Sequence, residues 1–287
     1  MAPIKRWNLP NEARIALSIV VNVEEGSEMN IAQGDRGPEV VDELGVALRK
    51  PIRNHANESN YLYGLKAGAP RIMRLLDEFA IQATFTAAAQ ALEKAPELTQ
   101  AIVAGGHEVC GHGWRWVHQF QMDEDQERDF IRKAVSSIKR TTGARPTGWL
   151  SRYLLTDNTR RLLVEEGFSY HMDDFSGDRP FWDTDHGKPI LILPYALDSN
   201  DMKMWTAPSL TPTDWLQYAI DTFDWLYREG ADDPQMMSFG LHLRIIGRPG
   251  RIGYFEKFLQ HVAAKPDVWI ATRQAIADNW AEQNPGP

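Results

Sequence analysis

The segment RIALSIVVNV, residues 14–23, is an apolar run rich in β-branched residues. Such a run predicts a strand that is buried in a parallel sheet. Similar apolar runs follow along the chain, and segments with apolar residues at helical spacing separate them. One of these segments places Ile72, Leu75, Leu76 and Phe79 on a single helical face. The alternation predicts repeated βα units around a parallel sheet.

The same alternation continues to the end of the chain and gives about seven βα units. The further predicted strands are QATFTAAA (82–89), HEVCGH (107–112), GWLSRY (148–153), SYHMDD (169–174), PILILPYAL (189–197), MMSFGLHL (236–243) and DVWIA (267–271). The predicted helices between them include ELTQAIVA (97–104), the stripe from Phe130 to Ile138, NTRRLLVEEG (158–167), the Trp-rich segment from Pro212 to Arg228, FEKFLQHVAA (255–264) and a last helix to Trp280.

No linker rich in Pro, Gly and Ser divides these units, so we expect one α/β barrel domain over residues 1–287. A doubly wound open sheet is the alternative. The stretch from Gly26 to Leu65 is too long for an ordinary connection. Loops of that length usually cover a site or form an interface, so we predict a loop insertion at about residues 26–65.

Composition excludes several classes of protein. With 43% hydrophobic residues and ten Trp in 287 residues, the chain can bury a large core. The net charge of -8 argues against a nucleic-acid-binding face, and no run reaches the roughly 18 apolar residues of a membrane span. The start MAPIKRWNLP lacks the apolar segment of a signal peptide. We therefore expect a cytoplasmic protein without nucleic-acid or membrane partners.

The single cysteine, Cys110, excludes an internal disulfide and a thiolate zinc cluster. It lies inside a short predicted strand, before the strand ends. A buried small hydrophobic residue is therefore the better interpretation than a nucleophile.

Polar residues follow the predicted strands where each strand ends. In order along the chain they are Asn22, Glu24 and Glu25, then His112, Arg152, the segment from Asp198 to Asp201, and His242. Each has a structural interpretation of its own: a solvated loop start, a turn histidine, an Asx-turn or a strand-end ion pair. In a parallel barrel, however, the carboxyl ends of the strands meet at one rim. Acid, base and donor groups from five segments would then converge, which favours an active site.

The segment GHEVCGHGWRW, residues 106–116, raises the question of a metal. Trp116 follows His112 by four residues, at the spacing where a second histidine would complete a metal-binding pair. An indole has no lone pair to offer to a metal.

The motifs together resemble the polysaccharide deacetylase superfamily, also called carbohydrate esterase family 4. Within it they are most similar to the branch of metal-independent allantoinases and cyclic imide hydrolases. The resemblance implies a distorted (β/α)7 barrel, a hydrolase that acts on non-peptide C–N bonds, and association into homo-oligomers, commonly tetramers. It rests on VVNVEEGSE, GHEVCGHGWRW, WLSRY with NTRRLLVEEGFSYHMDD, LPYALDSND and GLHLRIIGRPGR, in this order.

The chain departs from the metal-dependent members at the ligand positions. Those members use an Asp in the first motif and two His in an HxxxH pattern, where this chain has Glu25, His112 and Trp116. We therefore expect no cofactor. A divalent metal such as zinc is the alternative, held by Glu25, His112 and a recruited His118. Family deacetylases also place a Pro-Tyr after the arginine of the third motif, whereas Tyr153-Leu154-Leu155 follows Arg152 here.

Without a metal, a carboxylate must activate water and fixed donors must hold the oxyanion. Glu24 or Glu25 is the expected base, and His242 is the expected acid, oriented by an Asp of LDSND. His112 would bond a substrate carbonyl, and Arg152 would steady the oxyanion or the base. The expected substrate contacts are Asn22, Trp114, Trp116 as a wall against a flat ring, Asp201 and Arg248.

These residues predict a hydrolase that opens a small cyclic amide or imide. One alternative is a metal-dependent N-deacetylase of an acetamido sugar or peptidoglycan. Another is a catalytically silent barrel that binds a small ring compound. Trp and Tyr residues of WLQYAIDTFDWLY (215–227) could supply an interface between subunits.

Overall fold

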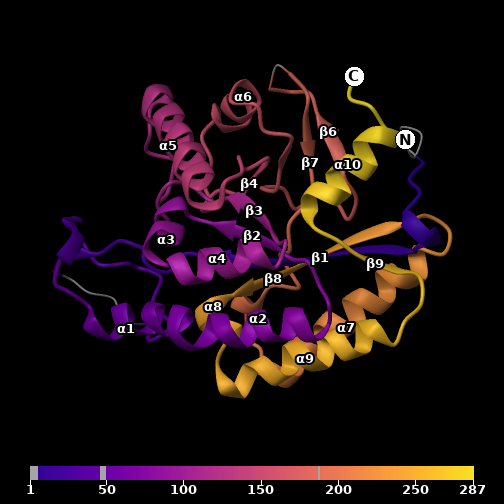
Figure 1. The fold of residues 1–287 in the computed structure, drawn as a ribbon, viewed down its shortest axis with the longest axis horizontal. Helices are drawn as coiled ribbons and strands as arrows, with labels where there is room; N and C mark the ends of the chain where they lie inside the picture. Colours follow the sequence, from indigo (N-terminus) through magenta and orange to yellow (C-terminus); the bar gives the residue numbers. More distant parts are fainter. Residues whose placement is uncertain (1–5, 46–49, 187) are drawn as a thin grey trace.

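The computed structural model describes residues 6–45, 50–186 and 188–287, and a curled, mostly parallel sheet forms its centre (Figure 1). The strands lie in the order β6-β7-β5-β4-β3-β2-β1-β8, and β9 pairs with the first half of β1. β6 runs antiparallel to β7, whereas the other pairs are parallel. Their bounds are β1 Ile15–Val23, β2 Thr84–Ala87, β3 Glu108–Gly111, β4 Gly148–Trp149, β5 Tyr170–His171, β6 Phe181–Asp183, β7 Ile190–Ile192, β8 Gln235–His242 and β9 Val268–Ile270.

The sheet closes on itself between β7 and β8. After β7 the chain runs on to Asn200, which forms a parallel β-bridge with Gly240 of β8. The Gly240 N–H donates to the Ser199 carbonyl at 3.0 Å beside this bridge. The parallel strands β1, β2, β3, β4, β5, β7 and β8 thus surround one interior. The predicted distorted (β/α)7 barrel is confirmed.

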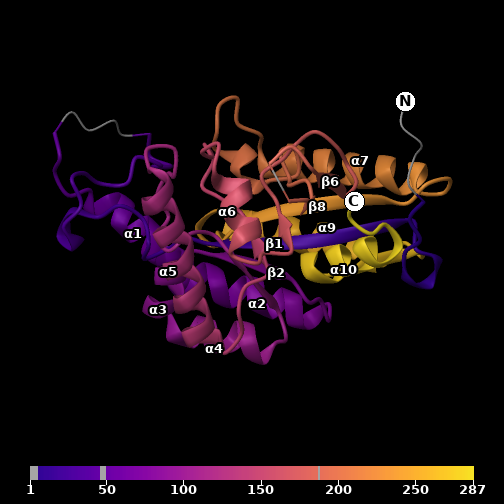
Figure 2. The same cartoon turned by 90° about the horizontal axis from the view of Figure 1, so that it is seen from above.

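β1 lies at the centre because both of its faces are apolar. Ile15, Leu17 and Ile19 pack outward against the helices, and Ala16 and Val20 point into the barrel interior. Every residue of the strand is buried. A strand covered on both faces needs a continuous apolar run, which is what residues 14–23 supply. In two perpendicular views, β1 and β8 cross the middle of the molecule with helices around them (Figures 1 and 2).

The outer helices follow the strands in the manner of βα units. α7 and α9 lie side by side, and α5 packs against α3 and α4 (Figures 1 and 2). α5 begins with a capping box between Asp123 and Gln126, and it ends at Gly143, which has a φ of 82°. The helices are α2 Ala69–Glu78, α3 Ala89–Lys94, α4 Pro96–Ala104, α5 Glu124–Thr142, α6 Thr159–Glu165, α7 Pro212–Glu229, α8 Leu243–Ile246, α9 Pro249–Ala263 and α10 Arg273–Gln283.

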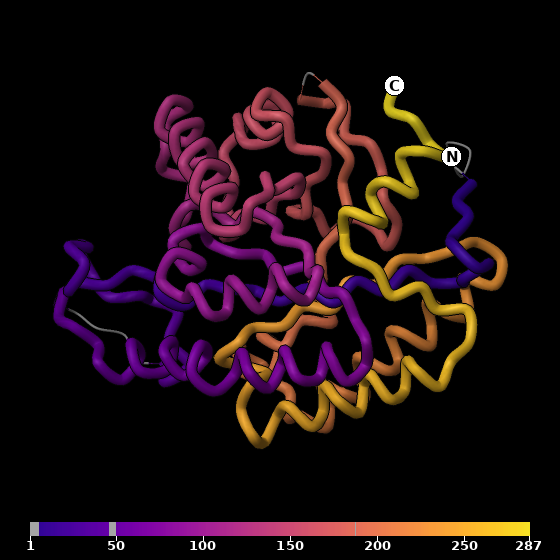
Figure 3. Tube along the Cα trace, in the orientation of Figure 1, coloured from indigo at the N-terminus to yellow at the C-terminus, as the bar shows by residue number. Residues whose placement is uncertain are grey.

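α10 and the N-terminal segment close the barrel at the amino ends of its strands. Trp280 meets Trp7 edge to face, with ring centroids 5.3 Å apart, and the two segments run beside each other (Figure 3). Arg273, the first residue of α10, is fully buried and donates to Ser238 Oγ at 2.6 Å. The interior is therefore filled from this end.

The predicted loop insertion at residues 26–65 contains regular structure, so its description as one long loop is wrong. It includes the short 3-10 helix η2 (Ile31–Gln33), helix α1 (His55–Tyr63) and the start of the π-helical turn η3 (Gly64–Gly68). The Asn54 side chain caps α1 by accepting from Asn57 N. The segment projects beyond the carboxyl ends of the strands, at the left of Figures 1 and 2. The remaining short helices are η1 (Pro10–Glu12) and η4 (Asp201–Met204).

Several strands are shorter than predicted. In β4, a side chain and not the neighbouring strand accepts the next backbone hydrogen bond. The Ser151 N–H donates to Asp173 Oδ2 at 2.8 Å, so β4 ends before GWLSRY is complete. Tyr153 then has a φ of 49°, which no strand residue adopts. The strand predicted over 189–197 is likewise reduced to Ile190–Ile192.

α7 contains the segment that could supply an interface. Trp215 and Phe223 are buried, whereas Tyr218 and Trp225 are exposed. The homotetramer stays a prediction. Among the described residues, no helix is both long and apolar enough to cross a membrane.

The close approach of β4 and β5 leads to a stability prediction. A Cβ added at Gly148 would lie 1.9 Å from Cζ of the buried Tyr170 ring. We expect Gly148→Ala to lower the free energy of unfolding by about 1–3 kcal/mol or more, because the ring cannot move without repacking the interior. Urea unfolding followed by circular dichroism measures the change. Gly253→Ala is the control, because nothing lies within 4 Å of its added Cβ in α9. It should be neutral or stabilising, and equal losses in both variants would contradict the explanation.

Candidate active site

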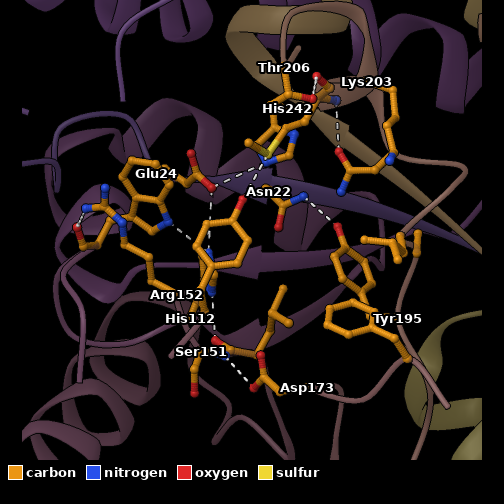
Figure 4. A pocket seen from close by; sticks show the side chains of 18 residues that line it. Asn22, Glu24, His112, Ser151, Arg152, Asp173, Tyr195, Lys203, Thr206 and His242 are labelled. Carbon is orange, nitrogen blue, oxygen red and sulfur yellow. Dashed lines mark hydrogen bonds and ion pairs between the residues drawn. The ribbon is translucent and has the colours of Figure 1, made fainter. Parts of the chain in front are cut away.

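A cavity of about 190 Å³ lies at the carboxyl ends of the barrel strands (Figure 4). Glu24, His112, Arg152 and His242 line it, and each follows or ends a different parallel strand. They meet because parallel strands place their carboxyl ends at one rim. The other lining residues are Asn22, Trp116, Leu150, Ser151, Tyr153, Asp173, Phe175, Tyr195, Ala196, Leu197, Asn200, Met202, Lys203 and Thr206.

Glu24 lies between the two histidines. Its Oε1 is 3.6 Å from His112 Nε2 and 3.4 Å from His242 Nε2, and all three side chains point toward one another in Figure 4. Its Oε2 accepts from Arg244 Nη1 at 2.7 Å. Burial alone would raise the pKa of Glu24, but Arg244 and His242 outweigh it and hold this pKa well below the usual range. Glu24 is therefore an ionised carboxylate that faces the cavity.

Glu25, the other candidate base, does not line the cavity. Its side chain turns away and accepts from Glu24 N at 3.1 Å and from Arg244 N at 3.2 Å. Its Oε1 also lies so close to Gly64 that a Cβ there would be 2.5 Å away. Burial and the neighbouring Glu24 charge, against the effect of Arg244, raise the pKa of Glu25 to about 7. The geometry makes Glu25 part of the packing behind Glu24.

His242 is held by Asp201. Asp201 Oδ1 is 2.7 Å from His242 Nδ1, and Oδ2 accepts from the His242 N–H at 2.8 Å. Burial alone would lower the pKa of His242, but the carboxylates of Asp201 and Glu24 raise it to about 10. The ring is thus an imidazolium at neutral pH, with Nδ1–H on Asp201 and Nε2–H on the cavity side. Asp201 itself does not line the cavity. It orients His242, whereas the sequence predicts that Asp201 contacts the substrate.

His112 and Trp116 form a second pair. His112 Nδ1 lies 2.7 Å from the Leu150 carbonyl and must donate to it, since a carbonyl can only accept. The Trp116 indole N–H donates to His112 Nε2 at 3.1 Å. Both ring nitrogens are therefore engaged, and the lone pair of Nε2 receives a proton donor from the residue at the second histidine position.

Arg152 is buried and paired with the insertion. Its Nη1 and Nη2 donate to the two carboxylate oxygens of Glu39 at 3.0 and 2.6 Å. Nη1 also donates to the Trp116 carbonyl at 2.6 Å, and the guanidinium lies 3.7 Å above the Trp116 ring. A bidentate pair of this kind fixes the arginine. Arg152 thus joins the insertion to the cavity wall.

Asn22 forms part of the cavity floor. Its side-chain nitrogen donates to Tyr195 Oη at 2.9 Å and to the Leu241 carbonyl at 3.0 Å, and its oxygen accepts from Thr86 Oγ1 at 2.6 Å. All of its donors are engaged.

Two predicted substrate contacts lie elsewhere. Trp114 is covered by Lys133 of α5, whose Nζ is 3.1 Å from the ring centroid. Arg248 lies over the Tyr63 ring at 3.7 Å and borders a separate hollow between α1 and α9. Neither residue lines the cavity that contains His112 and His242.

Arg244 was not predicted, and it is central to the site. It is fully buried, bonds Glu24, and lies 4.3 Å above the Tyr61 ring. The signal was available in HLRIIGRPGR, because Arg244 follows His242 by two residues. The prediction instead named Arg248, which precedes the Pro-Gly pair.

Comparison with known proteins identifies the family of this chain. The family model described as polysaccharide deacetylase matches residues 60–170. A Schizosaccharomyces pombe protein assigned as a polysaccharide deacetylase is 35% identical, and the match covers 99% of this chain and 95% of the relative. The chain belongs to the polysaccharide deacetylase family.

Two solved structures share the family fold closely. The crystal structure of PuuE allantoinase superposes with a TM-score of 0.93 at 41% identity, over 97% of this chain and 94% of that one. A protein of Pseudomonas aeruginosa PAO1 assigned as a polysaccharide deacetylase gives a TM-score of 0.93 at 40% identity, over 97% and 95%. The chain is a hydrolase of this deacetylase family.

The family's three-ligand metal site does not fit the side chains present. Trp116 replaces one ligand and occupies the lone pair of another, His112. Glu25 lies outside the cavity, and His118 Nδ1 is engaged 3.0 Å from the Arg152 carbonyl. In the described part of the chain, no three His, Cys, Asp or Glu side chains are grouped as metal ligands. The alternative ligand set of Glu25, His112 and His118 is therefore not assembled.

The contact between Asp201 and His242 can be tested without a substrate. We expect the His242 side chain to stay protonated through neutral pH and to lose its proton near pH 10. Asp201→Asn removes one of the two charges that stabilise the imidazolium, so the pKa of His242 should fall. A ¹⁵N NMR titration of the histidine side chains measures both values. An unchanged titration in the variant would show that Asp201 does not hold the charge.

Proposed function

We propose that this protein opens a small cyclic amide or imide by attack of water, without a catalytic metal. The observation that carries the proposal is the hydrogen bond from Trp116 Nε1 to His112 Nε2, at the position where family members bind a metal. With the metal site given up, the cavity still has an ionised carboxylate and a protonated imidazole 3.4 Å apart. These are the two groups that amide hydrolysis requires.

In the proposed reaction, Glu24 removes a proton from water while the water oxygen bonds to the ring carbonyl carbon. The carbonyl π electrons move to oxygen and form an oxyanion. When the oxyanion collapses, the ring C–N bond breaks, and the nitrogen takes the Nε2 proton of His242. The product has a carboxyl group and a free amide or urea nitrogen. The proton on Glu24 then passes to His242 Nε2, so both groups are restored and one water molecule is consumed.

The protonation states suit these roles at neutral pH. Glu24 is ionised and His242 is protonated before the substrate binds. The low pKa makes Glu24 a weak base, and general-base catalysis is most efficient when the pKa of the base lies near the operating pH. A weak base therefore needs a more reactive carbonyl group than that of a simple amide. Imides and hydantoins have a better leaving nitrogen than an acetamido sugar has. The site therefore favours a strained or activated ring.

The size and walls of the cavity support a small ring. At about 190 Å³ it is below the roughly 300–1,000 Å³ of pockets for drug-sized ligands. Trp116 lines the cavity, and the PuuE neighbour is an allantoinase. Allantoin, hydantoins and succinimide-like imides all share the planar edge that such a site would bind.

The second candidate is a metal-dependent N-deacetylase acting on an acetamido sugar or peptidoglycan. The Schizosaccharomyces pombe and Pseudomonas aeruginosa relatives favour it, because both are assigned as polysaccharide deacetylases. This function requires a metal. The hydrogen bond from Trp116 to His112 Nε2 would have to break before that nitrogen could bind one.

Removal of metal separates the two functions. We expect protein dialysed exhaustively against chelator to open at least one of allantoin, hydantoin, succinimide and dihydrouracil at the rate of untreated protein. Ring-opening is followed by ultraviolet absorbance, and residual metal is measured by mass spectrometry. Activity that vanishes on stripping and returns with zinc would overturn the metal-free mechanism, and deacetylation of N-acetylglucosamine oligomers would favour the second candidate.

Substitution of the two adjacent glutamates tests the assignment of the base. Glu24→Gln should lower kcat by about 10²–10⁴-fold, the usual contribution of a general base. Glu25→Gln should lose much less, because Glu25 lies behind the cavity wall and a glutamine resembles its protonated form. Steady-state kinetics on the ring that the wild type opens fastest measure both. The reverse order of losses would assign the base to Glu25.

A further inference from the structure

The proposed reaction forms an oxyanion, and the donors expected to hold it are engaged elsewhere. His112 donates from Nδ1 to Leu150 and accepts at Nε2. The Nη atoms of Arg152 are bonded to Glu39 and to the Trp116 carbonyl, and its Nε is sealed from solvent and from the cavity. His112 therefore has no N–H left for a substrate, and three of the five N–H groups of Arg152 are committed to Glu39 and Trp116. Another lining residue is better placed to act as the donor.

Tyr153 is the lining residue whose backbone is distorted. Its φ of 49° lies in the left-handed region, which a bulky residue adopts only when its surroundings require it. The residue before it, Arg152, is fixed by Glu39 from the insertion. Strained residues that persist are concentrated at functional sites, where the strain positions a side chain. Here it brings the Tyr153 ring to the cavity, where Met202 also lies.

The Tyr153 hydroxyl is available to donate to a ligand. Among the described residues it makes one hydrogen bond, to Met202 Sδ at 3.1 Å. A thioether is a weak acceptor, so a substrate oxygen competes with it easily. Partial burial and the nearby Glu24 charge raise the pKa of Tyr153 to about 12. The hydroxyl thus keeps its proton over the range in which Glu24 is ionised and His242 is protonated.

The cavity offers another phenol, but its hydroxyl is held in place. Tyr195 Oη accepts from Asn22, which in turn is bonded to Thr86. Moving Tyr195 Oη would leave the buried Asn22 N–H without one of its partners, so this hydroxyl can donate only from its fixed position. The Tyr153 hydroxyl can turn toward a substrate, because its one partner is a thioether.

We propose that the Tyr153 hydroxyl is a catalytic group, which donates to the oxyanion formed when water adds to the ring carbonyl. This role rests on the proposed ring-opening function. The hydroxyl turns from Met202 Sδ to the substrate oxygen, and it keeps its proton throughout. No further reactant is needed, because the proton accounting between water, Glu24 and His242 is unchanged. The hydroxyl would stabilise the negative charge on the carbonyl oxygen, which is what a metal does in a site of the three-ligand type.

Removal of the hydroxyl alone tests this role. Tyr153→Phe keeps the ring and the backbone strain, so its thermal midpoint should equal that of the wild type. We expect kcat to fall about 10²–10³-fold, as when one oxyanion donor is lost, with KM changed less than about threefold. The pH limits of kcat should stay in place, because Glu24 and His242 still set them.

Tyr254→Phe is the matched control. It removes a hydroxyl that accepts from Thr213 at 3.2 Å on the surface of α9, and it should leave kcat unchanged. Full kcat in Tyr153→Phe, or a loss matched by an equal fall in Tyr254→Phe, would overturn the role of Tyr153 while the ring-opening function stands. If the wild type opens no ring of the panel, the proposed function fails, and the role of Tyr153 fails with it.

Discussion

The site depends on Arg244, whose guanidinium is buried beside two consecutive buried carboxylates. Removing a carboxylate from water costs several kcal/mol unless a partner compensates, and Glu24 and Glu25 are adjacent. Arg244 donates to both carboxylates: its Nη1 donates to Glu24, and its backbone N–H donates to Glu25. The charged guanidinium bonds Glu24 more closely than Glu25, so Glu24 stays ionised and the pKa of Glu25 is raised to about 7. Two residues of the same type thus acquire different chemistry from one cation.

The other cations near that pair also have carboxylate partners. Asp201, which follows the bridge that closes the sheet, pairs with His242, and Glu39 of the insertion pairs with Arg152. Each cation of the site has its own anion from a different part of the chain. These charged groups are therefore held in fixed positions around the cavity.

The barrel and the meeting of Glu24, His112, Arg152 and His242 could be predicted from sequence. Each follows a strand that alternating apolar runs reveal, and parallel strands bring such positions to one rim. The pairings could not be predicted. Glu39 meets Arg152 across 113 residues, and it does so from a segment that lacks strand or helix periodicity. Which of two adjacent glutamates faces the cavity depends on the turn after β1, and the side-chain direction of Arg244 depends on α8. Those details are set by tertiary packing, which no local spacing encodes.

The bridge that closes the barrel also affects the charge of His242. The sheet closes at the bridge between Asn200 and Gly240, and the next residue after Asn200 is Asp201. The carboxylate that keeps His242 charged is thus attached to the last join of the barrel, and it also accepts from Ile246 N at 3.1 Å. If this bridge were broken, His242 would lose one of the two carboxylates that stabilise its charged form. Closure of the barrel and the charge of His242 are therefore coupled.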